Sequence, residues 1–329
     1  MHHNRCMANL NGSIALSGLQ TWRVTGTDAR TFLHGQLTQD IALMKPNQAR
    51  WSAYCTPKGR MLTTVLVQNS EQQSNDDLWL TLPSDTAAQT VQRLRMFVMR
   101  AKCTFEVQNG VNLWGVAGQH IPTELADQIW SRWHDSSQSC LWVRLPSAGS
   151  VARALCWAPA NIHPLGKDNP ISIETWNWLE IMAAQPWVTL NLRELYIPQM
   201  LNLESIEGIS FKKGCYPGQE VVARSQFRGA VKRKTTRVRI KVDPPHQHLP
   251  PLTSGHLDLI DNESGETIGE VYLAAFDPND AHILDALAIV PIDWVQSAES
   301  SHFTAKVRFN NHDLAVHHMG LPYPIRQDL

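Results

Sequence analysis

The chain lacks the long apolar run that a membrane span requires. It has 329 residues, of which 43% are hydrophobic, yet no stretch approaches ~18 consecutive apolar residues. Its first residues, Met1–Cys6, also lack the apolar core of a secretory signal. We therefore expect no membrane segment. The hydrophobic fraction excludes a disordered chain. At roughly 100–200 residues per domain, the length of the chain fits two or three domains.

Cysteine is scarce and scattered. The six cysteines lie at positions 6, 55, 103, 140, 156 and 215, and no Cys-x-x-Cys pair or Cys/His finger spacing occurs. These spacings argue against a zinc site and against a disulfide framework, so we predict no metal ligands. A reducing, cytoplasmic compartment fits this usage best.

Several common catalytic and nucleotide-binding motifs are also missing. The chain has no Gly-x-Ser-x-Gly elbow, no Walker phosphate loop and no Gly-x-Gly-x-x-Gly run. The net charge is −1, from 29 basic and 30 acidic residues, which argues against a bulk nucleic-acid coat protein. A local basic patch remains compatible with this balance.

The hydrophobic patterning predicts a mixture of strands and helices. Ser13–Thr25 is predicted to form one strand, and residues 51–68 a hairpin around a Pro-Lys-Gly turn. A helix is predicted after Ser84, because Ala87, Val91, Leu94 and Val98 share one face. Residues 122–133 and 171–184 are also predicted to be helical, whereas residues 185–218 are predicted to be rich in loops.

The fold class predicted from these elements is α+β. We expect one α+β domain over residues 1–110, a second over 111–223, and a C-terminal β-barrel over 224–329. A Pro- and His-rich stretch at 243–251 is the expected linker within the last part.

The run Lys212–Glu220 is the most informative stretch of the sequence. Its two glycines bracket a cysteine and a proline, so the backbone turns sharply and can present Cys215 to solvent. The lysines just upstream, Lys212 and Lys213, would favour the reactive thiolate. The alternative is a tight turn in which Cys215 is only a small hydrophobe. A protease-like nucleophile is disfavoured, because no histidine lies in a recognisable local motif.

A block of eight cations follows this loop, with no acidic residue among them. Its alternation places Val238 and Ile240 on one face of a strand and Arg237 and Arg239 on the other. This basic strand is either a charged edge that discourages aggregation or a site for an anionic ligand. The block consists of Arg224, Arg228, Lys232, Arg233, Lys234, Arg237, Arg239 and Lys241.

Tryptophan is abundant, with twelve residues, eleven of which precede residue 188. Most are expected to pack in the core, and one or two could stack on a flat heterocyclic ligand.

Three motifs together resemble the YgfZ family of folate-binding proteins. They are the run from Phe32 to Asp40, the run from Cys55 to Met61, and the hallmark run from Gly208 to Glu220 with Ala223-Arg224 after it. Their order and spacing match the family over the whole chain, and the Lys-Gly-Cys-Tyr-x-Gly-Gln-Glu run is highly specific.

The resemblance implies a fold like the T-protein of the glycine cleavage system, with three domains around a central folate pocket. It implies a tetrahydrofolate-binding accessory role in maturation or repair of iron–sulfur enzymes, and through them in tRNA thiomethylation. Cys215 would be the functional thiol, with Lys213 beside it. Trp176 aligns with a folate-contacting tryptophan, and Gln219 and Arg224 are further expected folate contacts.

The sequence departs from the family pattern at several positions. The second folate-contacting tryptophan aligns with Leu19, and an acidic residue of close relatives and T-proteins aligns with Met182. A pterin would lose a hydrogen-bond acceptor there. Thr63 and Thr64 replace the paired aspartates of T-proteins, so aminomethyl transfer lacks its acid–base group.

Three hypotheses for function follow. The first is the folate-dependent accessory factor, whose partners would be folate and iron–sulfur enzymes or assembly proteins. The second is a folate-dependent one-carbon (methyl) transferase. The third is a module that binds tRNA directly through the basic strand, for which the chain lacks an RNA-recognition motif.

Overall fold

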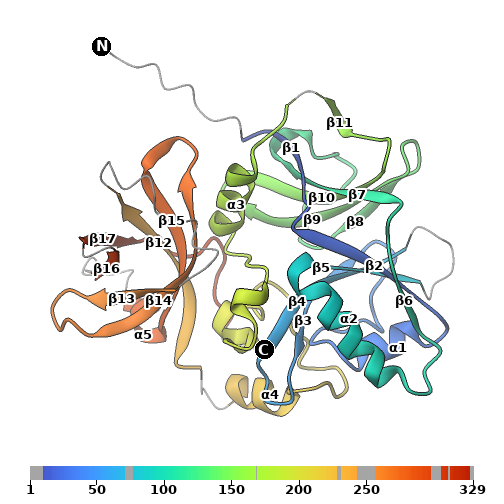
Figure 1. Cartoon of the computed structure of the whole chain (residues 1–329), viewed down its shortest axis with the longest axis horizontal. Coiled ribbons are helices and arrows are strands. Elements are labelled where there is room, and N and C mark those ends of the chain that lie inside the picture. Colours follow the sequence, from blue (N-terminus) through green and yellow to red (C-terminus); the bar gives the residue numbers. More distant parts are fainter. Residues whose placement is uncertain are drawn as a thin grey trace.

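The computed structural model describes residues 10–70, 77–167, 169–227, 231–242, 256–297, 305–309 and 312–326. Three β structures are built from them: two five-stranded antiparallel sheets and a closed six-stranded barrel (Figure 1). The predicted α+β class with a C-terminal barrel is confirmed. Among the described residues, no helix is long and apolar enough to cross a membrane.

The first sheet has the strand order β3-β4-β5-β2-β6. Two helices cover one of its faces, and the apolar positions of the second helix, Ala87, Val91 and Leu94, are buried as their spacing predicted. The predicted hairpin is formed by β3 and β4. The elements are β2 (Leu19–Thr25), α1 (Ala29–His34), β3 (Ala49–Cys55), β4 (Met61–Asn69), β5 (Leu78–Pro83), α2 (Ser84–Val98) and β6 (Thr104–Val107).

The second sheet has the order β1-β7-β10-β9-β8. Helix α3 follows it in the chain and, in Figure 1, stands between this sheet and the barrel. The elements are β1 (Gly12–Ala15), β7 (Val111–Ala117), the short 3-10 helix η1 (Gly118–His120), β8 (Arg132–Asp135), β9 (Cys140–Ala148), β10 (Val151–Pro159), β11 (Pro164–Lys167) and α3 (Ile173–Met182).

The barrel closes in the order β12-β15-β14-β13-β16-β17. Val238, Ile240 and Val242 fill its interior, so the predicted alternation of the basic strand is confirmed. The remaining elements are η2 (Leu190–Leu192), η3 (Pro198–Leu201), α4 (Gln219–Phe227), β12 (Arg233–Lys241), β13 (Leu257–Asp261), β14 (Thr267–Asp277), β15 (Asp280–Pro291), α5 (Ile292–Ser297), β16 (Ala305–Phe309) and β17 (His312–His318).

Two elements differ from the prediction. Ser13–Thr25 is not one strand, because the exposed Ser17-Gly18 turn breaks it and sends its two halves into different sheets. Residues 122–133 form no helix. Trp130 adopts a left-handed backbone (φ 66°), and its N–H and C=O groups bond to Arg144 and Ala49 instead. Tertiary hydrogen bonds therefore override the helical spacing of the apolar residues there.

One hydrophobic cluster joins the three β structures. It contains Trp51 of β3, Leu155 of β10, Leu179 of α3 and Leu287 of β15. Since β1 also belongs to the second sheet, the chain enters that sheet before it builds the first one. The domain boundaries at 110 and 223 remain a proposal, and the linker expected at 243–251 lies outside the described residues.

A buried carboxylate of the barrel, Asp285, bonds to a barrel arginine and also to α3. Asp285 of β15 is fully buried and accepts two hydrogen bonds from Arg239, from Nε at 2.7 Å and from a terminal nitrogen at 2.9 Å. It also accepts one from the Trp178 indole of α3 at 2.8 Å. Buried charges are tolerated only when paired and hydrogen-bonded in this way.

We expect Asp285→Ala to destabilise the protein by about 1–3 kcal/mol, because it removes the acceptor of the buried Trp178 N–H and leaves the partly exposed Arg239 guanidinium with Asp277 alone, at 3.6 Å. Urea unfolding followed by circular dichroism measures this. The control is Asp313→Ala, which removes an ion pair with Arg308 at the surface and should leave the unfolding midpoint unchanged. Equal losses in the two variants would contradict the structural role given to Asp285.

Candidate functional site

The loop-rich segment 185–218 lies against the first sheet and is held there by side chains. Val188 donates its backbone N–H to Thr64 Oγ1 at 3.0 Å, and its carbonyl accepts from Thr63 Oγ1 at 3.1 Å. Both threonines are fully buried. Thr63 and Thr64 therefore hold the backbone of the segment against β4 and supply no acid–base group.

The N-terminal motif fixes the start of the hallmark run. Thr38 Oγ1 donates to the Gly208 carbonyl at 2.7 Å, and the Thr38 carbonyl accepts from the Ser210 N–H at 3.0 Å. Lys213 is buried and donates from Nζ to the Leu37 carbonyl at 2.7 Å and to the His34 carbonyl. The ammonium group thus binds carbonyls at and just beyond the C-terminal end of α1, where a cation is favoured.

The second motif fixes the end of the same loop. Gly59 (φ 73°), at the tip of the β3–β4 hairpin, packs on Gly218 (φ 83°). A Cβ atom at Gly218 would lie 2.5 Å from the Thr56 carbonyl oxygen and 2.7 Å from the Gly59 Cα, so only glycine fits. All three sequence motifs therefore meet at residues 208–218.

This framework presents one thiol to solvent. Cys215 is exposed, whereas Cys55, Cys103, Cys140 and Cys156 are buried. The prediction that the loop displays Cys215 is consistent with this exposure, and α4 begins four residues later, at Gln219. The β3–β4 turn, the hydrogen bonds of Lys213 and the start of α4 thus hold the thiol on a defined surface loop.

The pKa of Lys213 differs from that of an exposed lysine. Burial lowers the pKa of Lys213 to about 8, while Asp40 and Cys215 act in the opposite direction. Its charge also lies 4.7 Å from the centre of the Tyr216 ring. The geometry gives Lys213 a positioning role, because its ammonium is already bound to two backbone carbonyls.

His34 and Asp40 lie next to this loop, and sequence reasoning did not single them out. His34 Nδ1 is 3.2 Å from Asp40 Oδ1, and a Cβ at Gly214 would lie 3.8 Å from His34 Nε2. Burial, and next the charge of Lys213, lower the pKa of His34, and Asp40 opposes them. Their place within the N-terminal motif was the signal available in the sequence.

Trp176 lies in the core, away from the Cys215 loop. It is 1% exposed, and the Arg153 guanidinium covers its ring at 4.9 Å from the centroid. Gly115 packs on the same indole so closely that an added Cβ would lie 2.8 Å from it. Both ring contacts are therefore made within the protein.

Glu180 completes this buried cluster. It accepts hydrogen bonds from the indoles of Trp176 and Trp187, each at 3.1 Å, and lies 3.8 Å from Arg153. Burial raises the pKa of Glu180, whereas Arg153 and the two indoles lower it. Burial likewise lowers the pKa of Arg153 to about 10.

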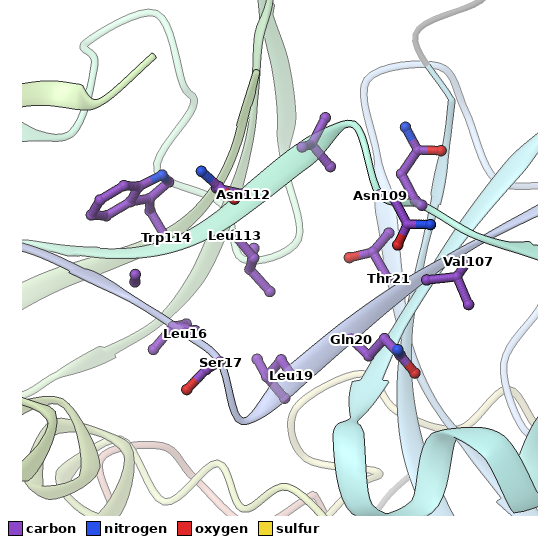
Figure 2. A pocket seen from close by; sticks show the side chains of 13 residues that line it. Leu16, Ser17, Leu19, Gln20, Thr21, Val107, Asn109, Asn112, Leu113 and Trp114 are labelled. Atoms are coloured by element: carbon purple, nitrogen blue, oxygen red, sulfur yellow. The ribbon is translucent and has the colours of Figure 1, made fainter. Parts of the chain in front are cut away.

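The other expected folate contacts lie elsewhere. Leu19 lines an open cavity where the chain passes between the two sheets (Figure 2). Gln219 opens α4, and Arg224 lies in the same helix, paired at 2.5 Å with Glu220. Lys213 and Cys215 lie in the loop that precedes α4 and Gln219 begins that helix, whereas Trp176 lies in α3 and Leu19 in β2.

A folate does not fit the residues predicted to hold it. The Trp176 ring is enclosed by Arg153 and Gly115, so a pterin has no face to stack on. Met182 supplies no acceptor for pterin N–H groups, and its carbonyl already accepts from Arg237 at 2.8 Å. These contacts give no support to Trp176 as a stacking platform, and the set Trp176, Leu19, Gln219 and Arg224 stays a prediction.

Much of the basic strand is engaged inside the protein. Lys234 pairs with the buried Glu204, Arg239 with Asp285, and Arg237 donates to carbonyls of Met182 and Gly320. Lys232, Arg233 and Lys241 are exposed, and Arg228 lies outside the described residues. In the part of the chain that the structure describes, no cluster of three or more His, Cys, Asp or Glu could hold a metal ion.

The lowered pKa of Lys213 predicts that the stability of the protein depends on pH. A lysine with a pKa near 8 when folded and 10.5 in its unperturbed state binds fewer protons in the folded protein between these values. The free energy of unfolding should therefore rise with pH across that window. Lys213→Met should flatten the rise, as measured by urea unfolding at pH 8 and above.

The control for this experiment is Lys212→Met, which removes the exposed neighbouring lysine and should keep the slope of the wild type. A slope that survives in Lys213→Met would show that the titration belongs to another group.

Comparison with known proteins identifies the family and the fold. No protein-family model matches the chain. The tRNA-modifying protein YgfZ of Hamiltonella defensa is 31% identical over 226 residues, covering 64% of this chain and 65% of the relative. The tRNA-modifying protein YgfZ of Cronobacter sakazakii is 30% identical over 235 residues, covering 67% and 69%.

A solved structure shows the same fold. The aminomethyltransferase T of the glycine cleavage system from Bartonella henselae superimposes with a TM-score of 0.70 at 15% identity, over 96% of this chain and 87% of that one. The three motifs, the T-protein-like fold and the two relatives agree: the chain belongs to the YgfZ family of tRNA-modifying proteins.

Proposed function

We propose that this protein is an accessory factor for tRNA modification that works through the Cys215 thiol. Its task would be the maturation or repair of iron–sulfur enzymes that thiomethylate tRNA, in the cytoplasm. The observation that carries the proposal is the convergence of all three family motifs on the loop that exposes Cys215.

The form of the loop supports a macromolecular partner. An exposed thiol on a clamped surface loop is accessible to another protein, whereas small-molecule catalysis generally uses a concave pocket. Lys213 and Gly218 hold the two sides of the loop, so the thiol is presented without a large ordering cost on binding. Iron–sulfur enzymes or their assembly proteins are the proposed partners.

A reduced folate, such as tetrahydrofolate, remains the proposed small-molecule ligand, on the strength of the family resemblance. The enclosed Trp176 ring excludes the predicted stacking platform in this conformation. The proposal therefore assigns folate no contact with Trp176 and no chemical step.

The two alternatives have less support. A one-carbon transferase would need a carboxylate where Thr63 and Thr64 are buried and bonded to Val188. Direct tRNA binding through the basic strand would have to rely on its exposed cations, since Lys234, Arg237 and Arg239 are engaged.

In a strain whose only copy carries Cys215→Ser, we expect thiomethylated tRNA bases to fall to the level of a deletion strain. Because Cys215 is exposed, the stability of the variant should stay within about 0.5 kcal/mol of the wild type. Mass spectrometry of tRNA nucleosides gives the readout. Lys212→Ala in the same loop is the control and should keep normal levels. Normal thiomethylation in the Cys215→Ser strain would refute the proposed role of the thiol.

Calorimetric titration tests the folate ligand. The wild type should bind tetrahydrofolate, and Trp176→Phe should bind it equally well while losing about 0.5–3 kcal/mol of stability from the core. Trp133→Phe controls for the substitution itself. No binding at millimolar ligand would remove folate from the proposal. A selective loss of affinity in folded Trp176→Phe would show that this ring opens to the ligand.

A further inference from the structure

Exposed apolar side chains gather at the C-terminal end of α2, a few residues before β6 begins (Figure 1). Met96 is 64% exposed, Phe97 47% and Met99 88%. Single exposed apolar residues are common on protein surfaces, but a contiguous group of them marks an interaction site. We propose that this patch, Met96, Phe97 and Met99, docks an acidic amphipathic helix of a partner protein. The proposal is independent of Cys215 and of the folate ligand.

Helix α2 buries one stripe of its surface and leaves these residues outside it. Val91 and Leu94 pack in the core of the first sheet, whereas Met96 and Phe97 lie off that stripe. The helix then ends at Met99, whose left-handed backbone (φ 38°) is uncommon for a residue other than glycine. A methionine side chain gains nothing from solvent, and its flexible thioether suits a surface that adapts to a partner.

Cations surround the patch. Residues 93–102 contain four basic residues and no acidic one. The Arg93 guanidinium lies 5.9 Å from the centre of the Phe97 ring, and Arg95 donates to the Phe105 carbonyl at 2.6 Å. These two arginines therefore make contacts within the protein and help to hold the end of the helix in place.

The other two cations of this run, Arg100 and Lys102, are exposed. Two acidic residues lie close in the chain or in space: Asp28, which accepts from the Lys102 backbone N–H at 2.7 Å, and Glu106 of β6. The four cations outnumber these acids, so the surroundings of the patch are positive. Complementary charge on a partner favours its encounter with this surface and fixes its orientation.

A notch of about 290 Å³ lies between the end of α2 and β6. β6 is the edge strand of the first sheet, so the notch is at the margin of that sheet. Val98, Cys103 and Phe105 give the notch an apolar lining that is continuous with the core. A concave apolar site of this kind takes an anchoring side chain of a docked helix.

These features favour a protein helix over other anionic surfaces. An anionic bilayer would leave the notch unfilled and would repel Glu106, which also lines it. A nucleic-acid backbone is typically held by about six to ten phosphate contacts, whereas the exposed cations of residues 93–102 are Arg95, Arg100 and Lys102, and Arg95 is already bonded to Phe105. An amphipathic helix supplies apolar side chains along one face and carboxylates beside them.

Fluorescence anisotropy on the full-length protein tests the proposal. The probe is a labelled synthetic helical peptide with leucines along one face and glutamates on both flanks. It should bind with a Kd of about 10–100 µM, because the patch is small and its complexes are transient. The same peptide with lysines in place of the glutamates should bind about tenfold more weakly or not at all.

Variants of the patch locate the binding. Phe97→Ser and Met99→Ser should each weaken binding of the acidic peptide about tenfold. The double variant Arg100→Glu, Lys102→Glu should reverse the preference, so that the lysine peptide binds more tightly than the glutamate peptide. Hydrogen exchange should show protection of residues 93–107 when the acidic peptide is bound.

The matched controls lie on other parts of the protein. Ile173→Ser changes an apolar residue of α3 that is 42% exposed, and Lys241→Glu changes an exposed cation of β12. Both should bind the acidic peptide as the wild type does. Circular dichroism confirms folding, and Met99→Ser, at the most exposed position, serves if Phe97→Ser does not fold.

Three results would overturn the proposal. They are the absence of acidic-peptide binding at millimolar concentration, equal binding of the glutamate and lysine peptides, and binding that the patch variants leave unchanged. Phosphatidylglycerol vesicles and unmodified tRNA are tested in parallel. If either binds, is released by Met99→Ser and binds where the acidic peptide does not, the patch belongs to that ligand and the proposal fails.

Discussion

The structure depends on how a buried, irregular segment satisfies its backbone hydrogen bonds. Residues 185–218 lie against the first sheet without adding a strand to it. Glu194 and Tyr196 exchange backbone hydrogen bonds with Met61 of β4, and other N–H and C=O groups of the segment need other partners. Side chains provide several of them: Thr63 and Thr64 at Val188, Thr38 at Gly208. This constraint fixes the path that ends at the Cys215 loop. Lys213 belongs to the segment itself, and its buried side chain donates to the backbone carbonyl of Leu37, just beyond α1.

Several of the tryptophans also satisfy polar groups inside the protein through their side chains. Trp176 and Trp187 both donate to Glu180, and Trp178 donates to Asp285, so indoles serve as hydrogen-bond donors to carboxylates, within α3 and from α3 to the barrel. An indole adds large apolar area and a single donor, which suits a core shared by three β structures. The prediction of core packing is confirmed for these rings. Stacking on an external ligand is not available to Trp176, because Arg153 takes its face.

Local signals in the sequence predicted local structure well. The β3–β4 hairpin, the buried face of α2 and the alternation of β12 all depend on neighbours within a few residues, and all are present. The failures share a physical cause, which is long-range pairing. Ser13–Thr25 splits because its halves find partners in different sheets, and Trp130 takes its hydrogen bonds from other strands. The three motifs indicated the family, but only the fold shows that they meet, with Gly59 packed on Gly218.

The basic strand shows that counting cations in the sequence overestimates how many of them are available at the surface for binding. Its alternation correctly separates barrel-facing residues from outward-facing ones, but outward here means toward α3 and the C-terminal segment. Arg239 is balanced by Asp285, which lies on the neighbouring strand, 46 residues away in the chain. Lys234 is balanced by Glu204, within residues 185–218. Acids distant in sequence therefore neutralise a block that contains none, and the Lys234–Glu204 pair ties the barrel to the segment that carries Cys215.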